Sequence, residues 1–326
     1  MSGRYAARQV TRDGVPVAEL ADKDADLMVS IAPGHGNIVF ELLHAGRNWV
    51  YSPYASPAQM QGKQDLFGIP LLAPWANRFS SDTYVVNGRE YTLNRKLGNL
   101  RLDKNHLAIH GFLTFTAWTQ TEVHADANGA DACSVLDFTR RPEWMAQFPF
   151  AHRLEWRHRL ANGRLSIRLS ITNESAEAMP LMVGFHPYFA IPGSGRDDWK
   201  IDLPVRTHMP VSDALIPTGE RQPAGFDGLA ELKSLSLDDV YTDLERDTAG
   251  NAIFRLTDAR HSVHVGFDTE FTVAVIYAPV ERNFICFEPM TAPTDAIHLA
   301  AEGRYSDLRT IAPGTAWTGE FWVEVS

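Results

Sequence analysis

The sequence has little cysteine, no long hydrophobic run and no excess of basic charge. Its two cysteines, Cys133 and Cys286, are too few and too far apart for a disulfide framework or a cysteine-rich zinc cluster, which indicates a reducing compartment. No stretch of about eighteen apolar residues occurs, and the N-terminus lacks the apolar core of a secretion signal. These absences predict a cytoplasmic protein that does not associate with a membrane.

The charge balance excludes another class of partner. The chain of 326 residues has 40 acidic and 30 basic side chains and a formal net charge of -10. Because no basic block offsets this charge, binding to nucleic acid or to an anionic membrane surface is disfavoured. A neutral or weakly charged small molecule is the expected partner.

Helical periodicity is scarce, whereas apolar side chains alternate with period two in many places. They alternate along 154–160 and again along 165–171, and Asn162-Gly163 between these segments is a strong hairpin turn. Further strands are predicted at 27–32, 37–43, 84–86, 90–93, 133–139, 253–257, 262–267, 271–277, 283–287 and 317–325. Short helical turns are predicted at 142–147 and 295–301. The pattern predicts an all-β fold, a large antiparallel β-sandwich with few short helices, in which residues 1–326 form one domain.

Two ionisable residues end apolar strands directly before a proline. His186 precedes Pro187 in "MPLMVGFHPYFAIP", and Glu288 precedes Pro289 in "ICFEPMTAPTDA". A proline disfavours helical backbone for the residue before it, so both side chains are expected on stiff, extended backbone. An imidazole and a carboxylate held in this way make a candidate acid–base pair. The alternative is that each is a polar strand end with a structural partner.

Other polar candidates lie in two glycine- and proline-containing segments. "FGIPLLAPWANRF" places Arg78 in a loop after Asn77, and a guanidinium suits the binding of several hydroxyls or of a carboxylate, with a structural pair to an aspartate as the alternative. In "HLAIHGFLTFTAW", His106 and His110 have the spacing of a zinc-binding helix, but Gly111 and the β-branched neighbours favour strand and turn. No metal site is therefore predicted.

A pair of aspartates forms the last candidate. Asp238 and Asp239 stand in the apolar frame "LSLDDVYTDL", which ends near Tyr241. Paired aspartates can bind sugar hydroxyls or calcium, but no EF-hand spacing follows them. An exposed turn is the alternative interpretation.

Six of these segments, taken in order, resemble the successive motifs of the aldose 1-epimerase (galactose mutarotase) family. They are "GIPLLAPWANRF", "IHGF" followed by Trp118, "FPFAHRL", "NESAEAMPLMVGFHPYF", "LDDVY" and "FEPMTAPTDA". The resemblance spans about residues 30–325. It implies that family's fold, the galactose mutarotase-like supersandwich, with a sugar site on a concave sheet face.

The resemblance also implies which residues bind the sugar. Substrate binding falls on Arg78, on His110 and on Asp238, with Asp239 as the close alternative to Asp238. Asn77 belongs to the loop around the arginine and is included among the substrate-binding candidates. The implied partner is a monosaccharide.

The implied reaction is mutarotation by acid–base ring opening. Glu288 would take the proton of the C1 hydroxyl while a protonated His186 gives one to the ring oxygen, and rotation about C1–C2 in the open aldehyde would present the other face. The reaction needs no metal and no cofactor. It requires the two side chains to reach opposite edges of one pocket sized for a single monosaccharide, with the pKa of His186 above that of Glu288.

Three alternatives to an aldose 1-epimerase that acts on an unphosphorylated sugar remain open. A hexose-6-phosphate 1-epimerase would need basic residues for the phosphate, yet Phe112, Leu113 and Thr114 follow His110-Gly111 where that branch carries an arginine. A non-catalytic sugar-binding protein would keep the fold without turnover. A polysaccharide lyase or hydrolase would need an open cleft. Galactose, glucose, xylose and arabinose are equal candidates, and a homodimer that covers an exposed sheet edge is left open.

Overall fold

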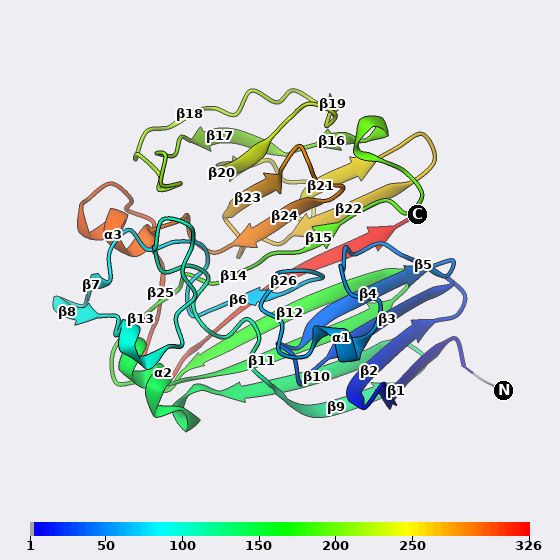
Figure 1. Cartoon of the computed structure of the whole chain (residues 1–326), viewed down its shortest axis with the longest axis horizontal. Helices are drawn as coiled ribbons and strands as arrows, with labels where there is room; N and C mark the ends of the chain where they lie inside the picture. The colour runs from blue at the N-terminus through cyan, green and yellow to red at the C-terminus, as the bar shows by residue number, and fades with distance from the viewer. Residues whose placement is uncertain (1–2) are drawn as a thin grey trace.

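The computed structural model describes residues 3–326, and its regular secondary structure is mainly β-strand (Figure 1). The strands are β1 (Tyr5–Arg12), β2 (Val15–Asp22), β3 (Leu27–Ala32), β4 (Ile38–His44), β5 (Arg47–Asn48), β6 (Leu71–Leu72), β7 (Thr83–Val86), β8 (Arg89–Thr92), β9 (Thr119–Ala125), β10 (Ala130–Asp137), β11 (His152–Ala161), β12 (Arg164–Asn173), β13 (Met179–Pro180), β14 (Gly184–Phe185), β15 (Tyr188–Phe189), β16 (Lys200–Asp202), β17 (Val205–Met209), β18 (Gln222–Pro223), β19 (Ala230–Glu231), β20 (Leu237–Leu244), β21 (Ala252–Thr257), β22 (Ser262–Phe267), β23 (Val273–Ala278), β24 (Ile285–Met290), β25 (Thr310–Ile311) and β26 (Ala316–Val325).

The helices are short. They are α1 (Pro57–Met60), α2 (Pro142–Gln147), α3 (Ala296–Ala301) and three 3₁₀ turns at Arg95–Leu97, Phe138–Arg140 and Arg196–Asp198. α2 coincides with the helical turn predicted at 142–147, and α3 begins one residue after the start of the turn predicted at 295–301. Among residues 3–326, no helix has both the length and the apolar character needed to span a bilayer.

Three large antiparallel sheets form the molecule. A nine-stranded sheet has the order β19-β16-β21-β22-β26-β12-β11-β10-β9, and an eight-stranded sheet has the order β18-β17-β20-β23-β24-β14-β6, with β15 paired to β24. A five-stranded sheet, β1 to β5 in chain order, lies beside β9–β11 and is drawn in blue in Figure 1. The predicted antiparallel all-β architecture with few short helices is confirmed.

The hairpins follow the turn chemistry of the sequence. β11 and β12 pair along their full length, and Asn162 and Gly163 between them adopt φ angles of 52° and 75°, which suit a tight hairpin turn. The strands predicted at 84–86 and 90–93 correspond to β7 and β8, which pair as a second hairpin. One interpretation was wrong: Asp238 and Asp239 lie within strand β20, paired to β23, and not in an exposed turn.

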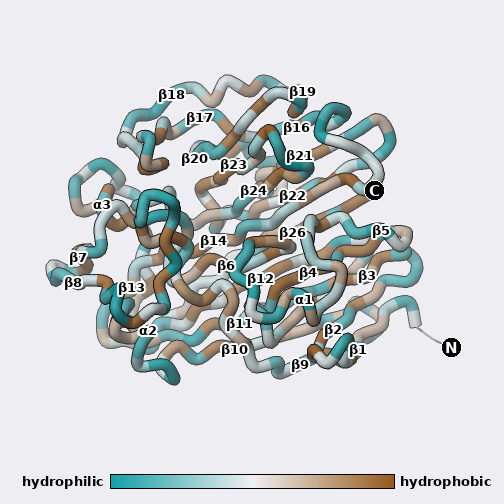
Figure 2. The backbone as a smooth tube through the Cα atoms, in the orientation of Figure 1, coloured by the Kyte–Doolittle hydropathy of each residue, from teal (hydrophilic) through white to brown (hydrophobic). Residues whose placement is uncertain are grey.

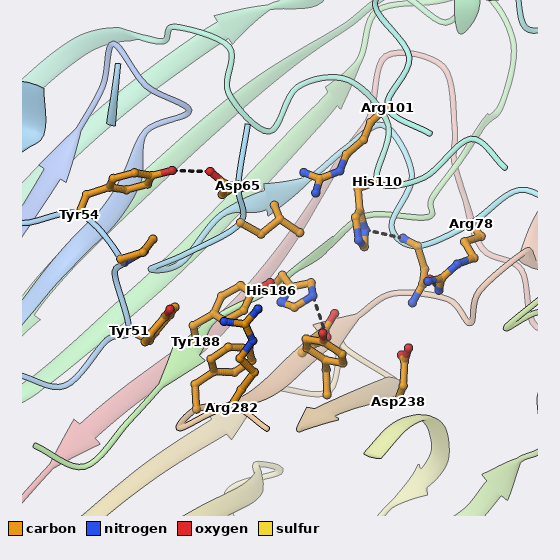
Figure 3. Close-up of a pocket in the computed structure, with 16 residues that line it drawn as sticks. Tyr51, Tyr54, Asp65, Arg78, Arg101, His110, His186, Tyr188, Asp238 and Arg282 are labelled. Carbon is orange, nitrogen blue, oxygen red and sulfur yellow. Dashed lines mark hydrogen bonds and ion pairs between the residues drawn. The ribbon is translucent and has the colours of Figure 1, made fainter. Parts of the chain in front are cut away.

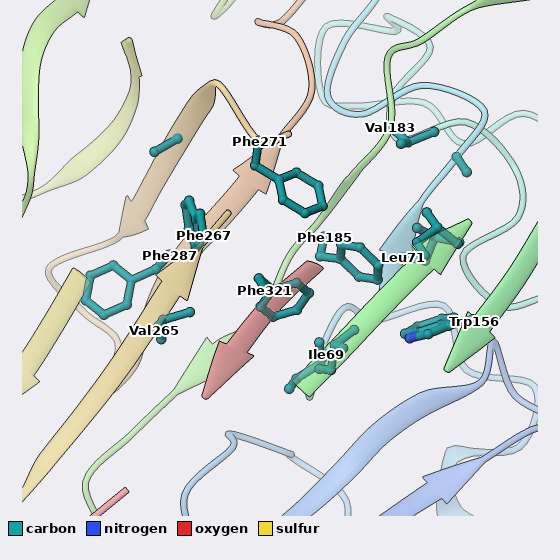
Figure 4. Close-up of a cluster of buried hydrophobic side chains, with 14 of the residues drawn as sticks. Ile69, Leu71, Trp156, Val183, Phe185, Val265, Phe267, Phe271, Phe287 and Phe321 are labelled. Atoms are coloured by element: carbon teal, nitrogen blue, oxygen red, sulfur yellow. The ribbon is translucent and has the colours of Figure 1, made fainter. Parts of the chain in front are cut away.

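The core lies between the eight-stranded and the nine-stranded sheets. Phe185 of β14 packs on Phe321 of β26 and on Trp156 of β11, with ring centroids 4.9 and 5.3 Å apart (Figure 4). Further along the same interface, Phe287 of β24 meets Phe254 of β21 at 5.7 Å. These contacts hold β14 and β24 against the nine-stranded sheet, and so fix the position of the strands that carry the candidate acid–base pair.

Strand alternation decides which side chains face away from this core. On β24, Ile285 and Phe287 belong to the main hydrophobic cluster, so Cys286 and Glu288 point to the opposite face of the eight-stranded sheet. Figure 2 shows that hydrophobic and hydrophilic residues alternate along many of the strands, as expected for sheets with one buried face. The outer face of this sheet therefore carries polar groups such as Glu288 and also a small apolar cluster that includes Val275 and Met290.

Candidate active site

A cavity of about 560 Å³ opens over the outer face of the eight-stranded sheet (Figure 3). It is lined by Tyr51, Pro53, Tyr54, Asp65, Leu66, Asn77, Arg78, Arg101, His110, His186, Tyr188, Asp238, Tyr277, Arg282, Phe284 and Glu288. The lining includes all six side chains that the sequence analysis selected as catalytic or substrate-binding candidates. Residues more than 200 positions apart in the chain thus share one pocket.

His186 and Glu288 face each other across two paired strands. Gly184 pairs with Met290 and Tyr188 pairs with Cys286, so the same antiparallel register sets His186 opposite Glu288. The Nε2 atom of His186 lies 3.2 Å from Oε1 of Glu288, and both side chains are at least 93% buried. The two groups are therefore in direct contact and do not lie at opposite edges of the pocket as the sequence analysis expected.

Burial works against the charged forms of both members of this pair. It lowers the pKa of the His186 imidazole to about 3, and the positive charges of Arg101 and Arg78 act in the same direction. Burial also raises the pKa of Glu288 well above its usual value, as does the nearby Asp238 carboxylate, while Arg78 opposes the shift. The pair therefore favours a neutral imidazole and a protonated carboxyl, the reverse of the pKa order expected from the sequence.

His110 and Asn77 are positioned by each other. The backbone N–H of Asn77 donates to Nδ1 of His110 at 3.1 Å, and the backbone N–H of His110 donates to the carbonyl of Asn77 at 2.8 Å. Both residues have left-handed backbone, with φ of 60° and 61°. Because Nδ1 accepts a hydrogen bond, a neutral His110 carries its proton on Nε2. Burial and the neighbouring His186, Arg101 and Arg78 lower the pKa of His110 well below its usual value, so that the ring is neutral.

Arg78 combines the two interpretations that the sequence left open. Its Nε donates to Oδ2 of Asp103 at 2.8 Å and one Nη1 hydrogen is donated to Oδ1 of Asn77 at 2.9 Å. The guanidinium is therefore anchored by a structural aspartate and also lines the pocket. Three of its five N–H groups remain available for a ligand.

Strand alternation separates the two aspartates of "LSLDDVYTDL". Asp238 pairs in register with Tyr277, which in turn pairs with Cys286, and it lines the cavity. Asp239 points to the other face and accepts a hydrogen bond from Nε2 of His208, with the two atoms 2.9 Å apart. Of the two, the structure brings Asp238 to the pocket.

Aromatic rings cover one side of the acid–base pair. The ring of Tyr188 stacks on His186 with centroids 4.6 Å apart and planes 10° apart, and Tyr277 meets the imidazole edge-on at 5.8 Å. Phe284 contacts both tyrosines. Phe189, which the sequence places beside Tyr188, instead belongs to the hydrophobic core and is fully buried there.

Two arginines in the pocket were missed by the sequence analysis. Arg101 comes from the irregular segment before His110, and Arg282 comes from the connection between β23 and β24. Within residues 3–326, neither forms an ion pair, and Arg101 donates one Nη1 hydrogen to the carbonyl of Gln64 at 3.0 Å. No strand or helix pattern surrounds either residue, so periodicity gave no signal for them.

Comparison with solved structures identifies the class of fold. The chain superposes on a galactose mutarotase-like protein from Clostridium acetobutylicum with a TM-score of 0.86 at 21% identity, covering 99% of this chain and 98% of that one. It superposes on galactose 1-epimerase from Lactobacillus acidophilus with a TM-score of 0.76 at 18% identity, covering 100% and 99%. The fold is therefore galactose mutarotase-like.

Sequence comparison identifies the family. A profile of the family described as aldose 1-epimerase matches residues 20–324, and the chain belongs to this family. It is 27% identical over 297 residues to the uncharacterized protein YphB of Escherichia coli, covering 84% of this chain and 89% of that protein. It is 26% identical over 274 residues to human galactose mutarotase, covering 81% of this chain and 66% of the human protein.

Proposed function

We propose that the protein is an aldose 1-epimerase that interconverts the α and β anomers of an unphosphorylated aldose by acid–base ring opening. The observation that carries the proposal is the 3.2 Å contact between His186 and Glu288 inside a pocket lined by hydrogen-bonding groups. The C1 hydroxyl and the ring oxygen are attached to the same carbon. Two groups that act on them together must therefore lie side by side, as these do.

The number of protons shared by His186 and Glu288 suits a reaction that must run in both directions. The neutral pair, with a protonated carboxyl, and the ion pair, with an imidazolium, contain the same number of protons and differ by one transfer between Glu288 and His186. If the carboxylate takes the C1 hydroxyl proton while the imidazolium protonates the ring oxygen, the open-chain aldehyde is left beside the neutral pair. Ring closure on the other face of C1 then restores the ion pair.

The remaining pocket residues orient the sugar in this proposal. Arg78 and neutral His110 supply N–H donors, whereas Asp238 supplies acceptor oxygens. The hydroxyls of a sugar ring can therefore both accept and donate hydrogen bonds in this pocket. Asn77 holds His110 and Arg78 in place through the hydrogen bonds described above. Tyr188, stacked on the imidazole, excludes water from one side of the acid–base pair.

The test is a polarimetric mutarotation assay with His186→Asn and Glu288→Gln. Each change should lower kcat by about 10²- to 10⁴-fold, because each removes one of the two proton-transfer groups. His208→Asn is a matched control, since His208 also contacts a carboxylate on the eight-stranded sheet but lies outside the pocket lining. Near-normal rates for either pocket variant would overturn the assignment. Tight sugar binding by a wild-type protein that does not accelerate anomer exchange would support a sugar-binding protein instead.

A second candidate substrate class is an aldose with an anionic group, such as a hexose 6-phosphate. The observation in its favour is that Arg101 and Arg282 both line the cavity without an ion-pair partner in residues 3–326. They supply basic groups that are missing after His110-Gly111. Comparing kcat/KM for glucose and glucose 6-phosphate, in the wild type and in Arg282→Gln, separates the two classes. A preference for the phosphate that is lost in Arg282→Gln would favour the second candidate.

A further inference from the structure

Cys286 lies directly beside the proposed acid–base pair but has no part in the proposed reaction. It is on β24, two residues before Glu288, and both side chains point to the pocket face of the sheet. In register it lies between Tyr188 on one neighbouring strand and Tyr277 on the other. Its side chain is fully buried and forms no disulfide. The thiol is therefore buried among the rings of Tyr188, Tyr277 and Phe284, which line the pocket.

The thiol forms a compact cluster with the two proposed catalytic side chains. One ring nitrogen of His186, the Sγ atom of Cys286 and one carboxylate oxygen of Glu288 all lie within 4.8 Å of one another, and all three residues are buried. Imidazole, thiolate and carboxylate are the protein ligands of Zn²⁺, and three of them with a fourth position left open form a common type of zinc site.

The spacing of the cluster is close to what a tetrahedral ion needs. Zinc bonds of about 2.0 to 2.3 Å place neighbouring ligand atoms about 3.3 to 3.8 Å apart. The His186 Nε2 to Glu288 Oε1 separation of 3.2 Å is already near this value. The other separations are at most 4.8 Å, so they would have to shorten by about 1 to 1.5 Å at most, which side-chain rotation can provide. His186 and Glu288 line the cavity, so an ion can reach them from the pocket.

We propose that His186, Cys286 and Glu288 form a binding site for a thiophilic divalent cation, with Zn²⁺ as the best-matched ion, and that the bound ion blocks the acid–base pair. Binding would release two protons to solvent, one from the Cys286 thiol and one from the Glu288 carboxyl, and leave the thiolate, the carboxylate and the neutral imidazole on the metal, with the fourth coordination position toward the pocket. The ion would occupy the nitrogen and oxygen atoms that the reaction uses, so it acts as an inhibitor that a chelator removes. Zn²⁺ binding at this site does not depend on the proposed function, whereas inhibition of mutarotation by the bound ion rests on it.

The binding experiment uses the full chain without sugar. Calorimetric titration with Zn²⁺ should show one site per chain, and Co²⁺ in its place should give a thiolate-to-cobalt charge-transfer absorption. Cys286→Ala should weaken Zn²⁺ binding at least tenfold and abolish this absorption. Cys133→Ala is the matched control, because Cys133 is the other buried free cysteine and lies on β10 in a different sheet; it should change neither measurement.

The outcomes separate the two parts of the inference. Failure of the wild type to bind Zn²⁺, or Zn²⁺ affinity that is equal in the wild type and in Cys286→Ala, overturns the site. If Cys286→Ala does not fold, Co²⁺ absorption of the wild type decides, and the absence of a thiolate band overturns the site. Inhibition by Zn²⁺ is measured by polarimetry, relative to the metal-free rate of each variant. Adding a chelator should restore the metal-free rate. A protein that binds Zn²⁺ through Cys286 but has no mutarotase activity keeps the site and loses the proposed function.

Discussion

Asn77 and His110 are joined by two hydrogen bonds that run in opposite directions, one from each backbone N–H. The bond to Nδ1 determines the tautomer of His110, and burial keeps the ring neutral. The side chain therefore presents an Nε2–H group, a donor whose direction is set by backbone. This arrangement makes the contribution to sugar binding that we propose for His110 measurable apart from proton transfer.

Replacing His110 by Gln should lower kcat/KM about tenfold, because one positioned donor is lost while the acid–base pair is kept. His106→Gln is the control. His106 belongs to the same segment and has the same left-handed backbone, with φ of 61°, but its side chain is exposed and does not line the pocket. Steady-state polarimetry of both variants checks the prediction, and equal losses would show that backbone strain, and not the donor, is responsible.

The rate should show no titration of His186 near pH 6.5. Burial lowers the pKa of His186 to about 3 and raises that of Glu288, so the pair keeps a single shared proton from acid pH up to the raised pKa of the carboxyl. A solvent-exposed histidine acid would instead titrate near pH 6.5. The measurement is kcat/KM between pH 5 and pH 8 after subtraction of the spontaneous reaction, since kcat/KM reports the free enzyme. A step near pH 6.5 that disappears in His186→Asn would contradict this protonation scheme.

Gly111 should not tolerate a side chain. Its φ is +60°, and a Cβ atom would lie 2.1 Å from the carbonyl oxygen of Ala73. Gly111→Ala should therefore lower the free energy of unfolding by more than about 3 kcal/mol or displace the adjacent His110. Gly303→Ala isolates the conformational part: its φ is +72° and no atom lies within 4 Å of the added Cβ. Gly303→Ala should lower the free energy of unfolding by only about 1–2 kcal/mol. Urea unfolding of both variants gives the comparison.

His158 should make the fold sensitive to acid. It is buried beside Trp156 on β11, and burial lowers its pKa to about 3. The folded state keeps this ring neutral while the unfolded chain binds a proton below pH 6.5. Its effect on stability is therefore absent above pH 6.5, and the free energy of unfolding falls by up to about 1.4 kcal/mol per pH unit between pH 6.5 and about 3.

The variant His158→Phe should reduce this acid-side slope, because no titrating group remains at the site. His124→Phe, on the exposed face of β9, should leave the slope unchanged. Urea unfolding at several pH values below 6.5 gives both slopes. An unaltered slope in His158→Phe would mean that other groups account for the acid sensitivity.

Alternation and turn chemistry predicted the strands that have one buried face. β11 and β12 follow this rule, and their predicted turn at Asn162-Gly163 is confirmed. β1 and β2 were missed. β1 contains mainly small and charged residues, whereas β2 contains a proline and has buried residues on both faces, so neither alternates clearly.

The candidate site was predictable where local sequence restricts the backbone. The prolines after His186 and Glu288 mark both residues, and the structure brings these two side chains into contact. Arg101 has no such mark: it reaches the pocket because its carbonyl accepts from the N–H of Ile109, which pairs with Arg78. The pKa order of the acid–base pair was also out of reach, since it depends on burial by loops distant in the sequence.

The order of strands β6, β14 and β24 places residues 71–72, 184–185 and 285–290 side by side in one sheet. More than 280 residues precede the last of these segments in the sequence, so it is synthesised long after the other two. A nascent or truncated chain that ends before this point therefore lacks both the carboxylate and the strand that aligns the imidazole. Closure of such distant segments is intrinsically slow, so the pocket is among the last parts of the molecule to be completed during its biosynthesis.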